Sequence, residues 1–178
     1  MLPHIDAAFN LARWLTRNDH DAEDVVQDAM LRAYRHFEGL RGEARPWLLA
    51  IVRNACFSWM QRNRPAELAA GPDGEAAEAA TAPADGPEAL LARELDRRML
   101  NEAIAALPLQ FREVLILREL EDLSYREIAR IANVPIGTVM SRLSRARGRL
   151  HAALVQSMGE ETGKPRDAGL GLRTGGDP

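Results

Sequence analysis

The sequence contains a single cysteine, Cys56, in a chain of 178 residues. One cysteine cannot form an intramolecular disulfide, and its place among apolar residues of an expected helix suits a small buried side chain. The four histidines are scattered without the spacing of metal ligands: His4, His20, His36 and His151. The single cysteine excludes a disulfide scaffold, and the scattered histidines indicate no metal site.

Other signatures are missing as well. No run of apolar residues is long enough to span a bilayer, and no signal peptide is recognisable. The sequence has no glycine-rich phosphate loop and no arrangement of a nucleophile with a base. We therefore expect a cytoplasmic protein without membrane insertion, cofactor or catalytic residue, and not an enzyme.

The strongest positive signal lies in residues 123–150, which predict two helices around a tight turn. Ser124 and Glu127 form a capping-box pattern at the start of the first helix. Asn133 suits the turn because asparagine adopts the left-handed conformation at lower cost than most residues. Pro135 suits the beginning of a second helix. This pattern is typical of a helix-turn-helix that lies on DNA.

The second of these helices, expected over residues 135–158, separates apolar from polar side chains. Apolar residues recur at three- and four-residue steps and predict a buried stripe, as at Val139, Leu143 and Ala146. Arginine on the other side can bond guanine edges or phosphates, and small hydroxyl residues allow close approach to the major groove. An ordinary solvated helix face is the alternative. The polar side carries Thr138, Ser141, Arg142, Ser144, Arg145 and Arg149.

The net charge is −3, which taken alone argues against a nucleic-acid-binding protein. The distribution of charge reverses that interpretation, because residues 41–64 contain five arginines against one acid and residues 126–149 contain six against one. Between them, residues 66–86 carry five acids and no cation in a stretch rich in Ala, Gly and Pro. Such a segment cannot bury enough apolar surface to order itself, so it predicts a flexible acidic linker between two small domains.

The first domain is predicted to be entirely helical. We expect an amphipathic helix over residues 5–15 and a second helix that starts with Asp21 as N-cap and runs to Phe37. The acids at its start are expected to form a solvated capping cluster. Further along, a mixed acidic and apolar surface can dock a partner: Gln27, Asp28, Leu31 and Tyr34.

A third helix is expected from Pro46, as its first residue, to a stop before Pro65. One side has an apolar stripe, and the other carries Arg53, Asn54, Phe57, Ser58, Gln61 and Arg62. An aromatic ring among cations and amides is typical of a single-stranded nucleic-acid surface, where the ring stacks on an unpaired base. Phe57 as a core residue is an equally open alternative.

Four segments in order, residues 10–29, 45–54, 107–118 and 137–147, closely resemble the extracytoplasmic-function sigma factors of bacteria. The resemblance covers about residues 5–157. It implies an all-α fold with a sigma-two domain and a sigma-four domain that contains the helix-turn-helix. The expected divisions are a sigma-two domain over 1–65, a flexible acidic linker over 66–87, a sigma-four domain over 88–158 and a disordered tail over 159–178.

The resemblance also implies roles for particular residues. Contact with core RNA polymerase falls to Asp24, Gln27, Asp28, Leu31 and Tyr34. Capture of the melted minus-ten strand falls to Arg53, Asn54, Phe57, Ser58 and Arg62. Readout of the minus-thirty-five element falls to Ser141, Arg142, Ser144, Arg145 and Arg147, which adds Arg147 to the residues predicted from the helix face.

Two residues depart from the family pattern. Ser58 stands where an acidic or amide residue is common, which affects the expected minus-ten preference, and Asn133 replaces the usual turn glycine at little expected cost. We expect a sigma subunit that brings RNA polymerase to promoter DNA, helps open it and is controlled by an anti-sigma protein. The alternatives are a stand-alone helix-turn-helix regulator and a sigma-mimicking decoy for an anti-sigma protein.

Overall fold

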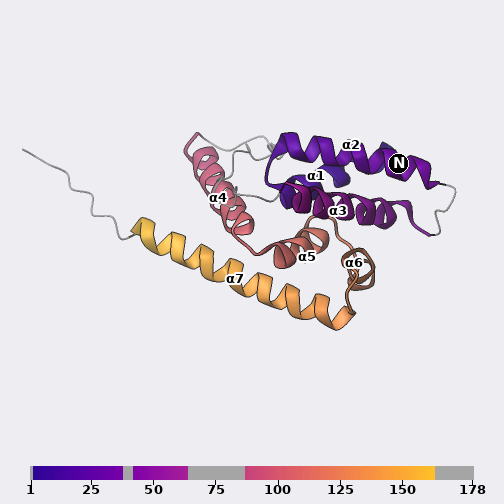
Figure 1. Cartoon of the computed structure of the whole chain (residues 1–178). Helices are drawn as coiled ribbons and strands as arrows, with labels where there is room; N and C mark the ends of the chain where they lie inside the picture. Colours follow the sequence, from indigo (N-terminus) through magenta and orange to yellow (C-terminus); the bar gives the residue numbers. More distant parts are fainter. Residues whose placement is uncertain (1, 38–41, 64–86, 163–178) are drawn as a thin grey trace, which may run out of the picture.

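The computed structural model describes residues 2–37, 42–63 and 87–162, and the regular structure within these ranges is entirely helical (Figure 1). The first unit consists of η1 (Leu2–His4), α1 (Ile5–Thr16), α2 (Asp19–Arg35) and α3 (Ala44–Arg62). The second unit consists of α4 (Pro87–Ala105), α5 (Leu109–Glu119), α6 (Tyr125–Ala132) and α7 (Ile136–Thr162). The predicted all-helical fold with two helical domains is confirmed.

Helices α1, α2 and α3 pack against one another in the first unit. Small residues let the backbones approach closely, and several of these alanines are completely buried: Ala8, Ala12, Ala22, Ala29 and Ala33. Larger aliphatic side chains such as Leu11, Leu48 and Val52 fill the remaining space. Each such leucine contributes roughly 1.5 to 3 kcal/mol through burial. The outer face of α2 is left uncovered by this packing.

The predicted start of the second helix was wrong. Helix α2 begins at Asp19, because Asn18 is the N-cap and its side-chain oxygen accepts a hydrogen bond from the Asp21 backbone N–H at 3.0 Å. Asn and Asp are equally good N-caps, so the sequence offered two candidates three residues apart. Helix α2 ends at Arg35, two residues before the predicted end.

The predicted start of the third helix was also displaced. Helix α3 begins at Ala44, so Pro46 is its third residue and not its first. Proline is tolerated throughout the first turn, because the N–H groups there have no intrahelical acceptor. Helix α7 begins at Ile136, directly after Pro135, and continues to Thr162 beyond the predicted end. The predicted linker residues 66–86 and the tail from residue 163 lie outside the described residues.

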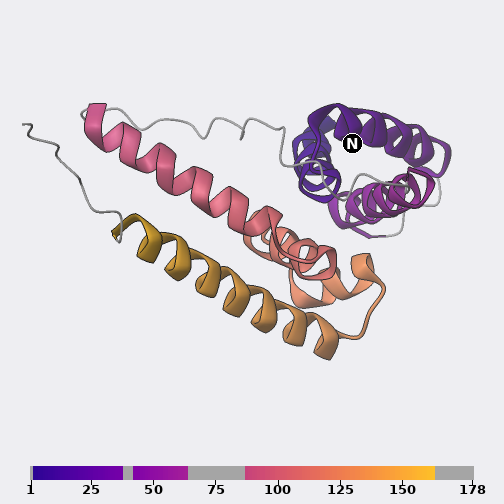
Figure 2. The ribbon, with the colours of Figure 1, turned by 60° about the vertical axis from the view of Figure 1, so that its left-hand side comes forward.

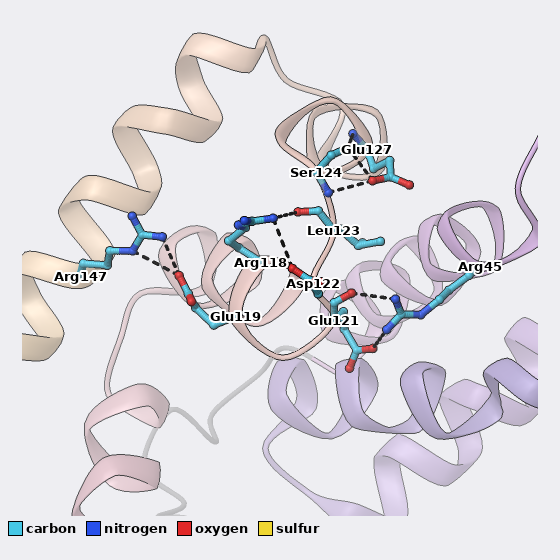
Figure 3. Close-up of polar contacts among 9 residues, drawn as sticks. All are labelled: Arg45, Arg118, Glu119, Glu121, Asp122, Leu123, Ser124, Glu127 and Arg147. Carbon is cyan, nitrogen blue, oxygen red and sulfur yellow. Dashed lines mark hydrogen bonds and ion pairs between the residues drawn. The ribbon is translucent and has the colours of Figure 1, made fainter.

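The helix-turn-helix is confirmed in detail. The Ser124 backbone N–H donates to the Glu127 carboxylate at 2.8 Å, and the Glu127 N–H donates to the Ser124 hydroxyl oxygen at 3.3 Å (Figure 3). Hydrogen bonds from the Ser124 side chain and backbone lower the pKa of Glu127. Asn133 ends α6 in the left-handed conformation, with φ 53°. The turn therefore uses the residues that the sequence marked for it.

Helix α5 is enclosed on every side, since all seven residues from Phe111 to Leu117 are buried. It contacts α6 and α7 within its own unit and α1 of the first unit, while α6 contacts α3. The buried apolar side chains of both units form one continuous cluster. In Figure 2 the first unit lies at one end of the long pair formed by α4 and α7. The two units are therefore packed directly against each other.

The left-handed turn at Asn133 generates a stability prediction. Asn133→Ala should lower the free energy of unfolding by roughly 1 kcal/mol, because the left-handed conformation is costly for most L-residues. Asn133→Gly should leave it unchanged or raise it. The measurement is urea unfolding followed by helical circular dichroism. Asn63→Ala is the matched control, since Asn63 caps α3 with an ordinary φ of −94°. Equal loss in Asn133→Ala and Asn63→Ala would contradict the argument.

Candidate nucleic-acid interface

The polar face of α7 presents cations and hydroxyls to the solvent. Ser141, Ser144 and Arg145 are exposed and Arg142 is half-buried, whereas the opposite stripe is buried at Val139, Leu143 and Ala146. Among the described residues, neither Arg142 nor Arg145 has an ion-pair partner. These two guanidinium groups are therefore available to an external anion such as a phosphate, or to the edge of a guanine.

Two further predicted DNA residues of α7 are engaged with α5 instead. The Arg147 guanidinium donates to the Glu119 carboxylate at 2.6 Å, and this hydrogen bond raises the pKa of Arg147 (Figure 3). The Arg149 guanidinium lies 5.1 Å from the centre of the Phe111 ring. Arg147 and Arg149 therefore contact α5, whereas Arg145 has no such contact and faces the solvent. Thr138 is half-buried, and its carbonyl accepts a hydrogen bond from the Ser141 hydroxyl at 3.0 Å.

Arginines of α6 also line the helix-turn-helix. Arg126 and Arg130 are exposed one turn apart and border an open hollow that continues over Asn133, Pro135 and Ile136. In the sequence these two arginines add to the positive charge of residues 126–149, and they are not among the residues predicted to contact DNA. Their spacing of four residues, which puts both on one helix face, was the signal that could have found them.

One face of α3 brings three predicted strand-capture residues together. The Arg53 guanidinium lies 4.0 Å from the centre of the Phe57 ring and donates to the Asn54 side-chain oxygen at 3.3 Å. Phe57 is half-buried under this guanidinium. It is therefore neither a fully buried core residue nor a fully open stacking platform. Further along the helix, Ser58 is half-buried and Arg62 is exposed.

Arg53 also reaches the second unit. Its Nε donates to the Glu113 carboxylate of α5 at 2.6 Å, and the two side chains are only 16% and 1% exposed. Burial raises the pKa of Glu113, and the hydrogen bond from Arg53 and the charges of Arg53 and Arg142 oppose that rise. Glu113 thus lies within electrostatic range of arginines from both predicted DNA-contacting helices. Sequence reasoning missed Glu113, because its partner is 60 residues away along the chain.

A second polar contact joins the units beside α6. Glu121, buried at 4% exposure of its side chain, accepts hydrogen bonds from Arg45 at 2.5 Å and from the Asn10 amide at 2.6 Å. Arg45 also donates to the Glu121 backbone carbonyl at 2.7 Å, as Figure 3 shows. Both buried acids at this interface are therefore neutralised by arginines of the first unit.

The outer face of α2 carries the predicted polymerase-contacting residues. Leu31 is 56% exposed, Tyr34 81% and Phe37 49%. Asp24 and Gln27 are exposed beside them, and Asp28 pairs with Arg32 of the same helix at 2.6 Å. No described part of the chain covers this face. The five predicted residues therefore lie on one helix surface that is open to a partner.

None of the described helices is long and apolar enough to cross a membrane. Within the described ranges, no group of three or more His, Cys, Asp or Glu side chains could hold a metal ion. Cys56 is completely buried, and desolvation raises the pKa of its thiol to about 12, so it is unreactive in the folded protein. The fold and the arginine-lined helix-turn-helix define a helical DNA-binding protein made of two packed units.

Comparison with known proteins identifies its family. The sequence matches Sigma-70 region 2 over residues 2–65 and Sigma-70, region 4 over residues 97–150. The ECF RNA polymerase sigma-E factor of Haemophilus influenzae is 39% identical over 145 residues, which cover 77% of this chain and 75% of that protein. The Escherichia coli K12 protein of the same name is 38% identical over 138 residues, covering 71% and 70%. The chain belongs to the ECF sigma factors of the sigma-70 family, which are not enzymes.

Solved structures agree with this assignment. The sigma factor RpoE in complex with the anti-sigma factor NepR from Bartonella quintana superimposes with a TM-score of 0.67 at 30% identity. The alignment covers 86% of this chain and 93% of that one. CnrH in complex with the cytosolic domain of CnrY gives a TM-score of 0.62 at 23% identity over 87% and 84% of the two chains, and shows the shared fold. The predicted family and its role in transcription initiation are confirmed.

Proposed function

We propose that this sigma factor docks on core RNA polymerase through the outer face of α2, captures the melted minus-ten strand with α3 and reads the minus-thirty-five element with α7. The observation that carries the proposal is the exposure of Leu31 and Tyr34 on one face of α2, with Phe37 exposed just beyond the end of the helix. Because core RNA polymerase acts in the cytoplasm, we expect this sigma factor to act there too. A stand-alone regulator would use the helix-turn-helix but would have no use for that face.

The exposed apolar side chains on and beside α2 favour docking on a partner protein. Exposed apolar groups are costly to hydrate, and patches such as the one formed by Leu31 and Tyr34 on α2 and by Phe37 after it mark protein interaction sites. Tyrosine and other aromatics are enriched among the residues that dominate binding energy at interfaces. Asp24 and Gln27 border the patch with an acid and an amide, which suits a basic partner surface and fixes the orientation of docking.

Helices α6 and α7 together form the surface that we propose reads duplex DNA. In a helix-turn-helix, the second helix enters the major groove while the first crosses the backbone. Arg142 and Arg145 on α7 are in position for base edges or phosphates, and Arg126 and Arg130 on α6 for phosphates. Arg147 can join them only by leaving Glu119. We therefore assign the main readout to Arg142 and Arg145, with Ser141 and Ser144 beside them.

Helix α3 carries the residues that we propose capture the melted strand. Phe57 offers a ring to an unpaired base, and Arg53 offers a cation to the backbone, which is the combination that single-stranded nucleic acid requires. Asn54 and Arg62 are exposed on the same helix and extend the polar surface. Ser58 lacks the acid or amide common at its position, so its contribution to base preference is expected to be small.

The proposed regulator is an anti-sigma protein. The similar sigma factor from Bartonella quintana was solved with one, and it shares 30% identity and most of its length with this chain. The expected domain divisions, 1–65, 66–87, 88–158 and 159–178, form part of the same proposal. An anti-sigma protein can act by covering the α2 face, since a covered face cannot dock on polymerase.

The α2 face generates a prediction on polymerase binding. Tyr34→Ala should weaken the affinity for core polymerase roughly 30-fold, which corresponds to a loss of about 2 kcal/mol at a binding hot spot. Asp24→Arg should abolish run-off transcription, because it sets like charges against a basic partner. Native gel shift with core polymerase and run-off transcription measure the two effects.

Asp96→Arg on α4 is the matched control for the charge reversal, since Asp96 is exposed in the second unit. It should bind core polymerase and support transcription like the wild type. Full transcription from Asp24→Arg together with wild-type binding by Tyr34→Ala would rule out α2 as the docking helix. Circular dichroism should show unchanged helicity in all three variants.

The recognition helix generates a prediction on duplex DNA. Arg142→Ala or Arg145→Ala should cost roughly 1 to 3 kcal/mol of binding, with relaxed specificity for a base contact or a lower salt slope for a phosphate contact. Arg147→Ala should cost less, because Arg147 is already paired with Glu119. Fluorescence anisotropy with a duplex selected from a random pool by the wild-type protein measures the series.

Arg98→Ala on α4 controls for the loss of one positive charge from the second unit, since Arg98 pairs with Glu94 away from the helix-turn-helix. Its affinity should match the wild type within a factor of two or so. If Arg98→Ala weakens binding as much as Arg145→Ala does, net charge and not the helix face governs the interaction.

A further inference from the structure

From the position of Glu113 we infer that this sigma factor inhibits itself: the carboxylate of α5 occupies the strand-capture surface of α3, so the two units must separate before that surface can bind melted DNA. The inference rests on the proposed role of Arg53 and Phe57. It requires no partner protein, because both sides of the contact belong to this chain.

The geometry of the contact resembles that of a bound strand. A strand would place a phosphate on the arginine and a base on the aromatic ring. Here the Glu113 carboxylate holds the Arg53 Nε at 2.6 Å, and the guanidinium covers the Phe57 ring at 4.0 Å. The anion position and the stacking position are both filled by protein groups. Arg53 retains only 16% of its side-chain exposure, so a nucleotide cannot reach it in this arrangement.

The chemistry of the interface favours a closure that can reopen. A carboxylate buried to 1% exposure loses its hydration, and its attraction to Arg53 offsets that loss only in part. Separation of the units rehydrates both charges, so this contact adds little net stability to the closed arrangement. A wholly apolar contact at the same place would gain nothing from water on opening.

Glu121 is the second buried acid of the interface, and it also binds an arginine of α3. It holds Arg45, at the start of α3, through its carboxylate and its backbone carbonyl, and it also accepts from Asn10 of α1 (Figure 3). Both buried acids of the second unit at this interface therefore pair with arginines of α3. Arginines of that helix are the groups that a promoter strand would need, so protein acids and DNA phosphates compete for one basic surface.

The test uses the full chain and a fluorescent single-stranded oligonucleotide of mixed sequence, about 12 nucleotides long, which is within the usual range of single-strand site sizes. Glu113→Gln keeps the shape of the side chain but removes the anion between Arg53 and Arg142. Its affinity for the oligonucleotide should rise about tenfold, because Arg53 left buried without its counter-charge destabilises the closed arrangement, and a binding-competent state populated at about one part in ten limits the wild type. Adding Phe57→Ala to Glu113→Gln should remove the gain.

Glu102→Gln on α4 is the matched control, since it removes one exposed acid of the second unit away from the interface. It should bind the oligonucleotide like the wild type. Glu121→Gln should raise the affinity in the same direction, and it decides the matter if Glu113→Gln loses helicity. Unchanged affinity in both folded interface variants, or an equal rise in Glu102→Gln, overturns the inference.

Run-off transcription with core polymerase separates this inference from the proposed function. If every variant supports transcription while the oligonucleotide affinities stay equal, self-inhibition is wrong and the sigma role stands. If the wild type neither binds core polymerase nor supports transcription, the proposed function fails, and the inference that rests on it fails with it.

Discussion

The burial of α5 on all sides is the constraint on which the rest of the structure depends. A helix whose residues from Phe111 to Leu117 are all buried needs cover from several directions, and its own unit supplies much of it through α6 and α7. The first unit supplies the remainder through α1 and through Arg53, which neutralises Glu113. The same contact determines which functional surfaces of the chain are open and which are covered.

This arrangement treats the proposed binding surfaces differently. The α2 face, with Leu31 and Tyr34, is open in the closed molecule, and so are the serines and Arg145 of α7. The α3 surface around Arg53 is covered. We infer that a sigma factor built in this way meets core polymerase without rearrangement and holds a melted strand only after α5 has moved. Docking therefore precedes strand capture in our account.

Local signals in the sequence predicted the elements that depend on local chemistry. The capping box at Ser124 and the left-handed residue Asn133 fixed the helix-turn-helix, because caps and turns are satisfied within a few residues. The start of α2 was misplaced because Asn18 and Asp21 are both good caps. The contact of Glu113 with Arg53 could not be predicted, since nothing near either residue indicates a partner 60 positions away.

The most direct test of the central claim is the distance between the two units before and after polymerase binds. Spin labels on Glu23→Cys in α2 and Gly148→Cys in α7 place both probes on exposed positions, and a side chain at residue 148 meets nothing within 4 Å. The buried Cys56 thiol, with its pKa of about 12, escapes labelling. Double electron–electron resonance should give one short distance in the free protein and a longer one in the complex with core polymerase. The same distance in both states would contradict the account.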